Sequence, residues 1–593
     1  MKSTAISLTK WAFVLLLLLP AAPAVRCQTW DDLNRRPYPQ WFADAKLGIF
    51  VHWGLYSVPA YASKEGYAEW LYKGLMSGDE GRLRAMSFWA DTTLPVHEMY
   101  AQLTGHWHAE LWQPAAWARL FREAGAGYVV LVTKHHDGYC LWDSPQQPVW
   151  NSVASGPRRN IVAELTEAVR AEGLRMGFYY SLPEWSNPRH RWTVDPDSAI
   201  GDYVDNYMVP QFKELVARYK PSLVFADGDW QNSADEFRST ELIDWYYRTV
   251  GPDAIVNDRW GRGTQHGFRT PEYSDGLDIV DRPWAECRGL GRSFGLNRNE
   301  DLDNYLTSTE LIQHFCSLVA HGGGLTLNVG PCADGTIPLL QQERLRDLGR
   351  WLQVNGEAVY GSRPWNNGAD SRHADREHRS MPMPPSTQID CDWVRNAPLK
   401  GMPVDNFEIH WQGRFETSGH ATCYIKAVAD DEITVVHEGD TILHHNHAWA
   451  ANNDVYETGR MDAAGHFDMD IYYRERDLEA SVSLLVSHDG VHYTPMPLEG
   501  LQGIATWQRT VRCFTQKGGN LYVIEFERPG STLEIPAMPR LKKGTEITLL
   551  GTTGSVRWKQ RKDDTLVLDL DALDPKELAA LGHAWVIKIV PAR

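Results

Sequence analysis

Three carboxylates in the first half of the chain stand where they could do chemistry. Asp227 follows directly on the apolar run Leu223-Val-Phe-Ala226, and Glu272 and Glu286 come on later segments. A carboxylate at the end of a buried run is costly unless it is hydrogen-bonded, so its position calls for a functional reason. Two carboxylates among Trp and His side chains are the groups a glycosidase uses. One attacks the anomeric carbon or stabilises its positive charge, and the other protonates the departing oxygen.

Polar side chains at the ends of predicted strands accompany these carboxylates. They are His52, His135, His136, Tyr180, Asp227 and Arg259. In a barrel of parallel strands the carboxyl ends meet at one rim, where active sites lie. Each residue alone reads equally well as an ordinary loop residue, whereas six together indicate a site.

A metal hydrolase is the rival interpretation. His52, His135, His136 and Asp227 are of residue types that ligate zinc. However, His135 and His136 point to opposite faces if strand geometry holds to the end, and the candidate histidines form neither an H-x-H nor an H-E-x-x-H motif. A G-x-S-x-G nucleophile elbow is also missing. The sequence therefore predicts chemistry without a catalytic metal or an organic cofactor.

The elements that must position these residues alternate along residues 28–365. Strand-like runs such as GIFVHWG (from Gly48) and LVFADGDW (from Leu223) alternate with helix-period segments such as IVAELTEAVRAEG (from Ile161). This alternation predicts β-α-β units and a parallel sheet. The length suits an α/β fold, a (β/α)8-like barrel with insertions. An open doubly wound sheet is the alternative, but no glycine-rich phosphate loop follows the first strand.

The composition limits the class of protein and its partners. The chain has 593 residues, too many for one ordinary domain, and its 43% hydrophobic and 23% charged residues are typical of globular proteins. With 59 Lys and Arg against 76 Asp and Glu, the net charge of −17 argues against nucleic acid or an anionic membrane as a partner. Tryptophan is abundant at 25 residues, and such polar-edged rings stack on sugar faces.

Residues 1–27 have the pattern of a secretory signal peptide. Lys2 and Lys10 precede an apolar run from Trp11 to Leu19, and the small residues Ala22-Pro-Ala24 follow. Cleavage after Ala24 or after Cys27 fits this pattern, and the run is too short to span a bilayer. We therefore expect a periplasmic or secreted protein without a membrane span. The eight cysteines show no C-x-x-C spacing, and the pairing of any disulfides stays open.

The alternation of strand-like and helix-period segments ends after Trp365. A polar, proline-bearing stretch from Ser371 leads into short β runs separated by frequent turn signals. These runs predict an inserted β-sandwich over residues 366–505, a candidate carbohydrate-binding domain, and a second β-sandwich over residues 506–593.

The segments around the candidate site resemble those of a known enzyme family. WFADAKLGIFVHWG, LVTKHHDGYCLWDS, LVFADGDW, RSFGLNRNED and GGGLTLNVGP are similar to segments of the α-L-fucosidases of glycoside hydrolase family twenty-nine, in family order. The resemblance implies a retaining exo-enzyme that releases terminal α-L-fucose from a fucosylated oligosaccharide or glycoconjugate through a covalent fucosyl-enzyme intermediate. The alternatives are a catalytically inactive relative that binds fucose or a glycan, and a barrel glycosidase for a related sugar such as galactose.

The family roles transfer to individual positions of this chain. The nucleophile falls on Asp227, and Glu272 in Thr270-Pro-Glu-Tyr273 matches one arrangement of the acid/base, with Glu286 in Trp284-Ala-Glu-Cys287 as the rival. The expected substrate-binding residues are His52, Tyr67, Glu69, Trp70, His135, His136, Tyr180, Phe225, Arg259 and Phe294, the last against the C5 methyl of fucose. Retention requires the two carboxyl groups to lie about 5–5.5 Å apart.

The two predicted sandwiches carry resemblances of their own. Gly413-Arg-Phe-Glu-Thr-Ser-Gly419 and the Asp430-Asp431 pair are similar to the protective-antigen-type sandwich found in several glycosidases. In sugar-binding versions an Asp pair can hold calcium, and a purely structural role is the other interpretation. The segments from Trp507 onward resemble the C-terminal sandwich that accompanies fucosidase barrels.

Overall fold

The computed structural model describes residues 29–190, 199–274, 279, 281–366, 372–394, 397–420, 422–447, 456–462, 464–476 and 480–592. The predicted signal peptide at residues 1–27 lies outside these ranges. Within them, no helix combines the length and the apolar character needed to cross a bilayer.

The first part of the chain forms a curled parallel sheet of seven strands in the spatial order β5-β4-β3-β2-β1-β7-β6. The strands are β1 Leu47–Val51, β2 Tyr128–Lys134, β3 Arg175–Ser181, β4 Leu223–Asp227, β5 Ile255–Val256, β6 Ala285–Gly289 and β7 Gly324–Val329. β1, β2, β4 and β7 are buried along their whole length. Continuous burial is what a parallel sheet with both faces covered requires, and it explains why these strands are apolar runs.

An irregular segment bridges the two edge strands β5 and β6. Phe268 pairs with Asn257 just after β5, Arg269 pairs with Trp284, and Glu272 pairs with Cys287 of β6. Pro271 has no amide hydrogen to continue a regular ladder, so only isolated bridges form. The segment takes the place of an eighth strand, and the predicted (β/α)8-like fold class is confirmed with one irregular member.

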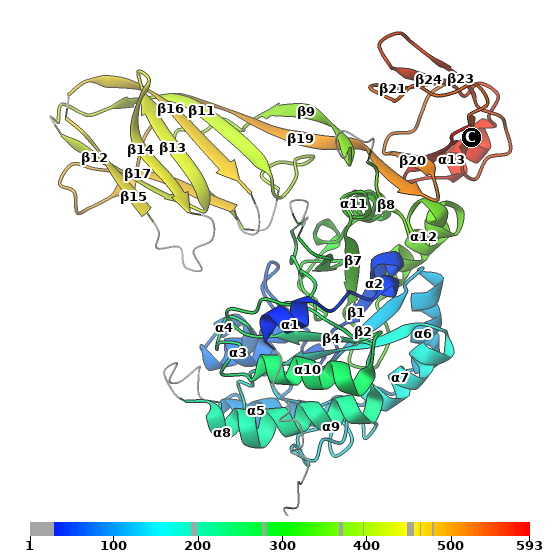
Figure 1. Cartoon of the computed structure of the whole chain (residues 1–593). Coiled ribbons are helices and arrows are strands. Elements are labelled where there is room, and N and C mark those ends of the chain that lie inside the picture. The colour runs from blue at the N-terminus through cyan, green and yellow to red at the C-terminus, as the bar shows by residue number, and fades with distance from the viewer. Residues whose placement is uncertain are drawn as a thin grey trace, which may run out of the picture.

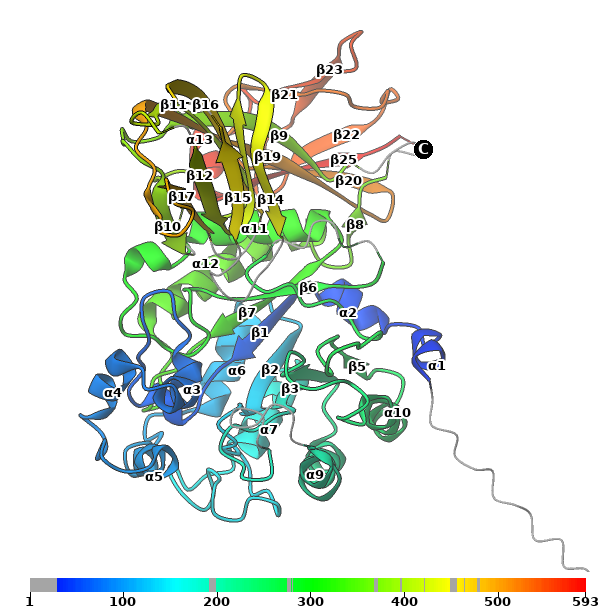
Figure 2. The ribbon, with the colours of Figure 1, turned by 90° about the vertical axis from the view of Figure 1, so that its left-hand side faces the viewer.

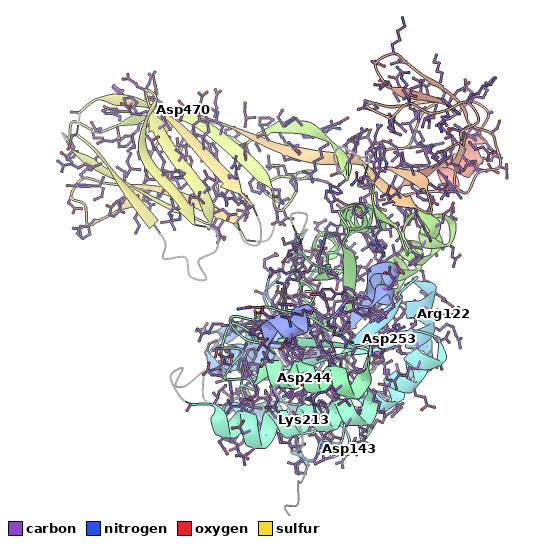
Figure 3. The ribbon with its side chains drawn as sticks, viewed as in Figure 1. Arg122, Asp143, Lys213, Asp244, Asp253 and Asp470 are labelled. Carbon is purple, nitrogen blue, oxygen red and sulfur yellow. The ribbon has the colours of Figure 1, made fainter. Side chains whose placement is uncertain are left out.

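Helices follow the strands and surround the sheet (Figure 1). The long ones are α6 Pro114–Glu123, α7 Ile161–Ala171, α9 Val209–Tyr219, α10 Ser239–Val250, α11 Ser308–Ala320 and α12 Leu339–Asn355, and the short ones are α1 Trp30–Asn34, α2 Gln40–Ala45, α3 Leu71–Met76, α4 Glu80–Met86, α5 Val96–Ala101 and α8 Gly201–Tyr203. α11 begins with a capping box, in which the Thr307 hydroxyl accepts from the Glu310 amide and the Glu310 carboxylate accepts from the Thr307 amide. Figure 3 labels Lys213 on α9, which pairs with Glu241 of α10 at the outer surface.

Part of the tryptophan content belongs to the core of the barrel. The buried Trp53 packs against Trp107, Trp112 and Trp117 with ring centroids 5.1, 5.4 and 5.1 Å away. Clusters of this geometry stabilise a core beyond the area they bury. All four rings are buried, so they are part of the core.

The rest of the chain is almost entirely β, as predicted, and lies on the side of the barrel that carries α11 and α12 (Figure 2). Its elements are β8 Arg363–Pro364, β9 Ala374–Pro382, β10 Asp390–Val394, β11 Phe407–Glu416, β12 Cys423–Ala429, β13 Asp431–His437, β14 Asp440–His447, β15 Tyr456–Met461, β16 His466–Glu475, β17 Ala480–Ser487, β18 Thr494–Pro495, β19 Glu499–Lys517, β20 Asn520–Glu525, β21 Thr532–Ile535, β22 Glu546–Leu549, β23 Arg557–Gln560, β24 Leu566–Asp569, α13 Pro575–Ala580 and β25 Trp585–Val590.

These strands form two sandwiches, each with its own apolar core. In the first, which we call the insert sandwich, β14-β13-β16-β11 faces β10-β17-β12-β15. In the second, β20-β25-β22 faces β21-β24-β23. The seven cysteines within the described residues are all free thiols.

The long strand β19 belongs to both sandwiches. Residues 499–507 pair with β11, and residues 512–517 pair with β20. β9 lies antiparallel to β19, with Ile504 opposite Pro382 and Cys513 opposite Ala374. The chain therefore enters the insert sandwich on β9 and returns from it on the neighbouring strand β19. The sequence pattern suggests a domain boundary at residue 505, which lies inside β19.

Candidate active site

A narrow cavity of about 70 Å³ lies at the carboxyl ends of the barrel strands. Its lining residues are Phe50, His52, Tyr67, Glu69, Trp70, His135, Tyr179, Phe225, Asp227, Trp230, Arg259, Glu272, Cys287 and Phe294. Ten of the twelve site residues predicted from the sequence are among them; His136 and Tyr180 are not. The cavity is far smaller than the 300–1,000 Å³ of a drug-sized site, so it has room for one small ring at most.

Asp227 ends β4 and is held by three side chains. The Tyr179 hydroxyl donates to its Oδ2 at 2.7 Å, His136 Nε2 lies 3.4 Å from the same oxygen, and Arg259 Nη1 lies 3.6 Å from Oδ1. Burial raises the pKa of Asp227, but the hydrogen bond and charge of His136, the charge of Arg259 and the Tyr179 hydroxyl outweigh it. Together they hold the pKa of this carboxyl well below its usual range. Asp227 is therefore a carboxylate at neutral pH.

Arg259 joins the two candidate catalytic carboxylates. Its Nη1 lies 2.6 Å from Glu272 Oε2 and 3.6 Å from Asp227 Oδ1, so these two oxygens are at most 6.2 Å apart, the sum of the two distances. The other oxygen of Glu272 accepts a hydrogen bond of 2.8 Å from the Tyr67 hydroxyl. This bound on the separation lies below the 6.5–9.5 Å typical of inverting glycosidases and allows the roughly 5–5.5 Å of retaining ones.

His52 follows β1 and is oriented by β7. Asn328 Nδ2 donates to the Phe294 carbonyl at 2.6 Å, so its Oδ1 faces His52 Nδ1 at 2.6 Å. That arrangement places the proton of a neutral ring on Nδ1 and leaves Nε2 as an acceptor. Burial lowers the pKa of His52 to about 3, which keeps the ring neutral.

His135 and His136 follow β2 and divide their roles. Burial, with the neighbouring His136 and His52, holds the pKa of His135 well below its usual range. His135 Nδ1 has no hydrogen-bond partner among the described residues. His136 Nδ1 lies 2.5 Å from the Ser181 hydroxyl, and that hydroxyl donates to the Pro183 carbonyl. His136 thus contacts Asp227 and lies behind the cavity wall.

Glu69 contributes polar surface to the cavity, and Phe294 contributes apolar surface. Glu69 Oε2 accepts from the Gly295 amide at 2.7 Å and from the Ser293 hydroxyl at 3.3 Å. Burial raises the pKa of Glu69 to about 7. The Phe294 ring packs 4.9 Å from His52 and 5.6 Å from Tyr67 between ring centroids. The cavity therefore offers an apolar wall beside a ring of hydrogen-bonding groups.

The structure corrects the prediction for Tyr180. Its hydroxyl donates to Gln211 of α9 at 2.9 Å, on the outside of the sheet. Successive side chains of a strand point to opposite faces, so the neighbour Tyr179 faces the cavity instead. The two tyrosines are adjacent in the sequence, and only the register of β3 decides which one points inward.

Glu286 lies on the outside of the barrel and does not reach the cavity. It is fully buried against α11, where it contacts His314, and Arg288 lies 3.7 Å away. The next residue on β6, Cys287, faces the cavity and pairs with Glu272. Of the two candidates for the acid/base, the structure brings only Glu272 to Asp227.

Several residues of the site were not singled out by sequence reasoning. Tyr179 and Trp230 line the cavity, while Asn328 and Ser181 orient His52 and His136. Asn328 sits in the otherwise apolar strand β7, so a polar side chain inside a buried strand was the available signal.

Within the described residues, no three His, Cys, Asp or Glu side chains are arranged to hold a metal ion. In the Asp430-Asp431 pair, Asp431 Oδ2 accepts from the Arg476 amide at 2.6 Å, and Asp430 Oδ1 accepts from the Asp431 amide at 3.1 Å. These oxygens are engaged by the protein itself.

A parallel (β/α)8-like barrel with two carboxylates at its rim and a narrow cavity between them defines a glycoside hydrolase. Comparison with known proteins specifies the family. A family model for "Alpha-L-fucosidase" matches residues 19–357, and one for "Alpha-L-fucosidase C-terminal domain" matches residues 506–590. The chain belongs to the α-L-fucosidase family.

Individual relatives agree with this assignment. An alpha-L-fucosidase of Dictyostelium discoideum is 40% identical over 368 residues, covering 60% of this chain and 78% of the relative. The tissue alpha-L-fucosidase of Homo sapiens is 37% identical over 367 residues, covering 59% and 77%. Among solved structures, the alpha-fucosidase of Thermotoga maritima in complex with a mechanism-based inhibitor matches with a TM-score of 0.61 and 26% identity, covering 95% of this chain and 99% of that one.

Proposed function

We propose that this enzyme is a retaining exo-α-L-fucosidase that releases terminal fucose from glycans, with Asp227 as nucleophile and Glu272 as acid/base. The observation that carries the proposal is Arg259, which holds both carboxylates within 4 Å of one nitrogen atom and so at a separation that allows the roughly 5–5.5 Å of retaining enzymes. Relatives of known structure support the choice of sugar, since the Thermotoga maritima enzyme has been solved in complex with fucose.

The reaction takes place in two steps. The Asp227 carboxylate attacks C1 of fucose while Glu272 gives its proton to the glycosidic oxygen, so the bond to the glycan breaks and a fucosyl ester of Asp227 forms. Glu272, now a carboxylate, takes a proton from water, and the water oxygen attacks C1 and displaces Asp227. Two displacements at one carbon return the original anomer.

The cavity supports fucose by its mixture of surfaces. Neutral His52 and His135 can accept and donate to hydroxyl groups, and Glu69 adds a carboxyl group beside them. Phe294 offers apolar surface to the C5 methyl, where a galactose-type sugar would place a hydroxymethyl group. The small volume of the cavity supports action on a single terminal sugar.

We further propose that the chain is exported and that the insert sandwich is of the protective-antigen type. The first rests on the charged start, apolar run and small residues of segment 1–27. The second rests on the sequence resemblance and on the sandwich architecture of β10–β18.

The experiment that tests the proposal is hydrolysis of 4-nitrophenyl α-L-fucoside by wild type and by Asp227→Ala, with and without azide. We expect the wild type to be active and Asp227→Ala to lose at least about 10³-fold in kcat. Azide should restore turnover in the variant and give the inverted fucosyl azide, because the small anion occupies the space of the missing carboxylate. An inactive wild type on a panel of fucosides would instead indicate a binding protein.

A further inference from the structure

The lining of the catalytic cavity divides into a buried floor and a partly exposed mouth. Nine of the fourteen lining residues are buried, among them His52, Asp227 and Phe294. The other five are half-buried and form what we call the mouth: Tyr67, Trp70, Trp230, Arg259 and Glu272. Because a cavity of about 70 Å³ holds one small ring at most, every further sugar of a glycan lies at the mouth or beyond it.

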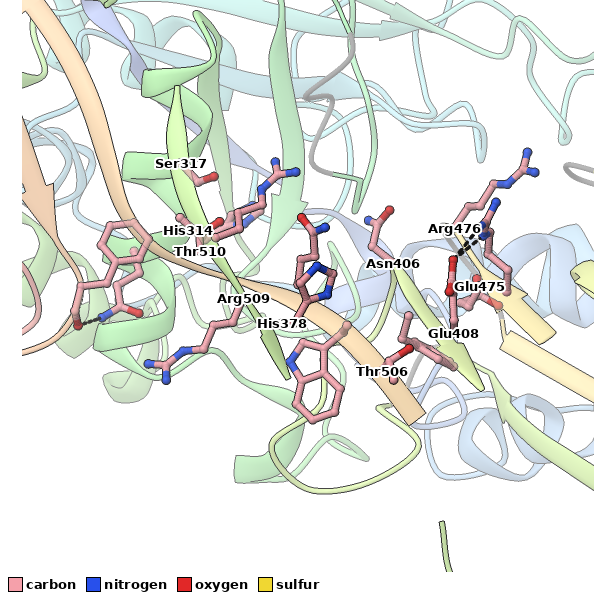
Figure 4. A pocket seen from close by; sticks show the side chains of 17 residues that line it. His314, Ser317, His378, Asn406, Glu408, Glu475, Arg476, Thr506, Arg509 and Thr510 are labelled. Atoms are coloured by element: carbon pink, nitrogen blue, oxygen red, sulfur yellow. Dashed lines mark hydrogen bonds and ion pairs between the residues drawn. The ribbon is translucent and has the colours of Figure 1, made fainter. Parts of the chain in front are cut away.

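Two larger cavities lie between the barrel and the insert sandwich and are separate from this mouth. The first, of about 620 Å³, has Ser317 of α11 on one side and Glu408 of β11 on the other (Figure 4). The second measures about 650 Å³. Neither shares a lining residue with the catalytic cavity. We therefore expect the sugar that is joined directly to fucose at the mouth and not in these cavities.

Contacts between the mouth residues run from the proposed acid/base to Trp230. Glu272 Oε1 accepts from the Tyr67 hydroxyl at 2.8 Å, and the rings of Tyr67 and Trp70 lie 6.4 Å apart between centroids. The rings of Trp70 and Trp230 are stacked, with centroids 5.9 Å apart and planes at 28°. The mouth thus has a polar part at Glu272 and Arg259 and an aromatic part at the two indoles.

The turn after β4 fixes the position of Trp230. Gly228 has a φ of 100°, in the left-handed region, and a Cβ added there would lie 2.2 Å from Pro183 Cδ. Beyond this turn, the Trp230 ring packs edge-on against His136, with centroids 5.4 Å apart and planes at 76°. The ring is therefore held in one place while it stays half-exposed, which suits it to bind the flat face of a sugar.

We propose that Trp230 binds the first sugar of the leaving group, the one joined to fucose, by stacking against its ring face. The ligand is a pyranose ring, whose C–H groups pack on the indole while its hydroxyl groups stay in water. Trp230 thereby selects leaving groups that present such a face over leaving groups that do not. This inference rests on the proposed function and adds a specificity-determining residue to it.

The test compares substrates that share fucose and differ in the leaving group. α-L-Fucosyl fluoride has a leaving group of one atom, whereas fucosylated oligosaccharides with α1,2, α1,3, α1,4 and α1,6 linkages have a sugar in its place. For the oligosaccharide that the wild type cleaves fastest, Trp230→Ala should lower the ratio of its kcat/KM to that of the fluoride about tenfold, as loss of an aromatic contact does. Taking the ratio removes any effect of the variant on the fucose site itself.

Three further variants show whether the ring face is what matters. Trp230→Phe keeps a ring and should hold the ratio within about threefold of wild type, whereas Trp230→Leu keeps apolar volume without a ring and should behave as Trp230→Ala does. Trp245→Ala is the matched control, because Trp245 of α10 is also half-buried but lies outside the catalytic cavity. It should leave both kcat/KM values within about threefold of wild type. Circular dichroism and Tm establish that each variant is folded.

The outcomes separate this inference from the proposed function. An unchanged ratio in Trp230→Ala would overturn the inference, and an equal fall for both substrates would show that Trp230 acts instead through His136, which contacts Asp227. A wild type that hydrolyses the fluoride but none of the oligosaccharides would also contradict the inference, while hydrolysis at fucose would stand. A wild type inactive on all of these substrates would remove the proposed function, and the inference with it.

Discussion

Asp227 stays ionised although it is buried, because three neighbours favour its charged form. Tyr179 contributes the shortest of these contacts, 2.7 Å from its hydroxyl to Oδ2. In the mechanism that we propose, Asp227 attacks carbon as a carboxylate, so we expect these contacts to set the pH at which the enzyme begins to work. Tyr179 acts through Asp227 and is a positioning residue.

We predict that Tyr179→Phe raises the pKa of Asp227 and lowers kcat about tenfold. Loss of a hydrogen bond to the carboxylate disfavours the charged form, so the acid limb of the kcat/KM profile should move to higher pH. Tyr180→Phe is the control, since it deletes the same hydroxyl from the next residue on the opposite face. An unmoved acid limb in Tyr179→Phe, or an equal movement in Tyr180→Phe, would show that this hydrogen bond is not what controls Asp227.

We predict that replacing Glu272 lowers the rate of catalysis, whereas replacing Glu286 lowers the thermal stability. Glu272→Gln should slow hydrolysis of glycans about 10²–10⁴-fold, the usual contribution of general acid–base catalysis. Formation of the fucosyl-enzyme from the nitrophenyl fucoside should slow less, because nitrophenolate leaves without needing a proton. Glu286→Gln should keep kcat within a few-fold but lower Tm, because that side chain is buried against His314 of α11. Steady-state kinetics on both substrates and thermal unfolding would distinguish the two. The reverse pattern would make Glu286 the acid/base.

At the scale of the elements, the end of β2 is fixed by a buried ion pair. Lys134 Nζ lies 2.7 Å from Glu184 and 3.1 Å from Gln211 of α9, and the side chains of Lys134 and Glu184 are both 0% exposed. His135 and His136 come directly after Lys134. The pair therefore holds the strand end from which both site histidines extend.

We predict that Lys134→Met lowers the free energy of unfolding of the barrel by about 3–5 kcal/mol, since it leaves Glu184 buried and unpaired. The double variant Lys134→Met/Glu184→Leu should recover most of this loss, because no uncompensated charge remains. Urea unfolding followed by tryptophan fluorescence measures both. A double variant as unstable as the single one would mean that packing, and not charge, stabilises this strand end.

Much of the barrel and its site could be predicted because apolar runs that end in polar residues mark parallel strands. This pattern placed His52, His135, Asp227 and Arg259 at one rim. It could not choose between Tyr179 and Tyr180, or between Glu272 and Glu286, because a shift of one residue turns a strand side chain to the other face. It also could not show that β19 continues through residue 505, since the period-2 pattern is the same in both sandwiches.

At the scale of the whole molecule, the catalytic cavity and the insert sandwich are built from different parts of the chain. All residues that line the cavity come from positions 50–294, whereas the insert sandwich begins after β8. The Met383 amide donates to the Gly503 carbonyl at 2.8 Å, so the chain enters and leaves the insert sandwich at one point.

We predict that the insert sandwich can be removed without loss of the core activity. In the shortened chain, an Asn-Gly turn replaces residues 384–502 and joins the paired strands β9 and β19. It should keep kcat/KM for 4-nitrophenyl α-L-fucoside within about threefold, as the cavity residues are untouched. A folded but inactive product would show that the insert sandwich supports the catalytic centre.

The central claim is that Asp227 and Glu272 act together as a retaining pair. The most direct measurement is the proton NMR spectrum of the reaction during its first minutes, before fucose mutarotates. The account predicts that α-L-fucose appears first and β-L-fucose only later. If β-L-fucose appears first, the enzyme inverts, and Asp227 cannot form the covalent intermediate proposed for it.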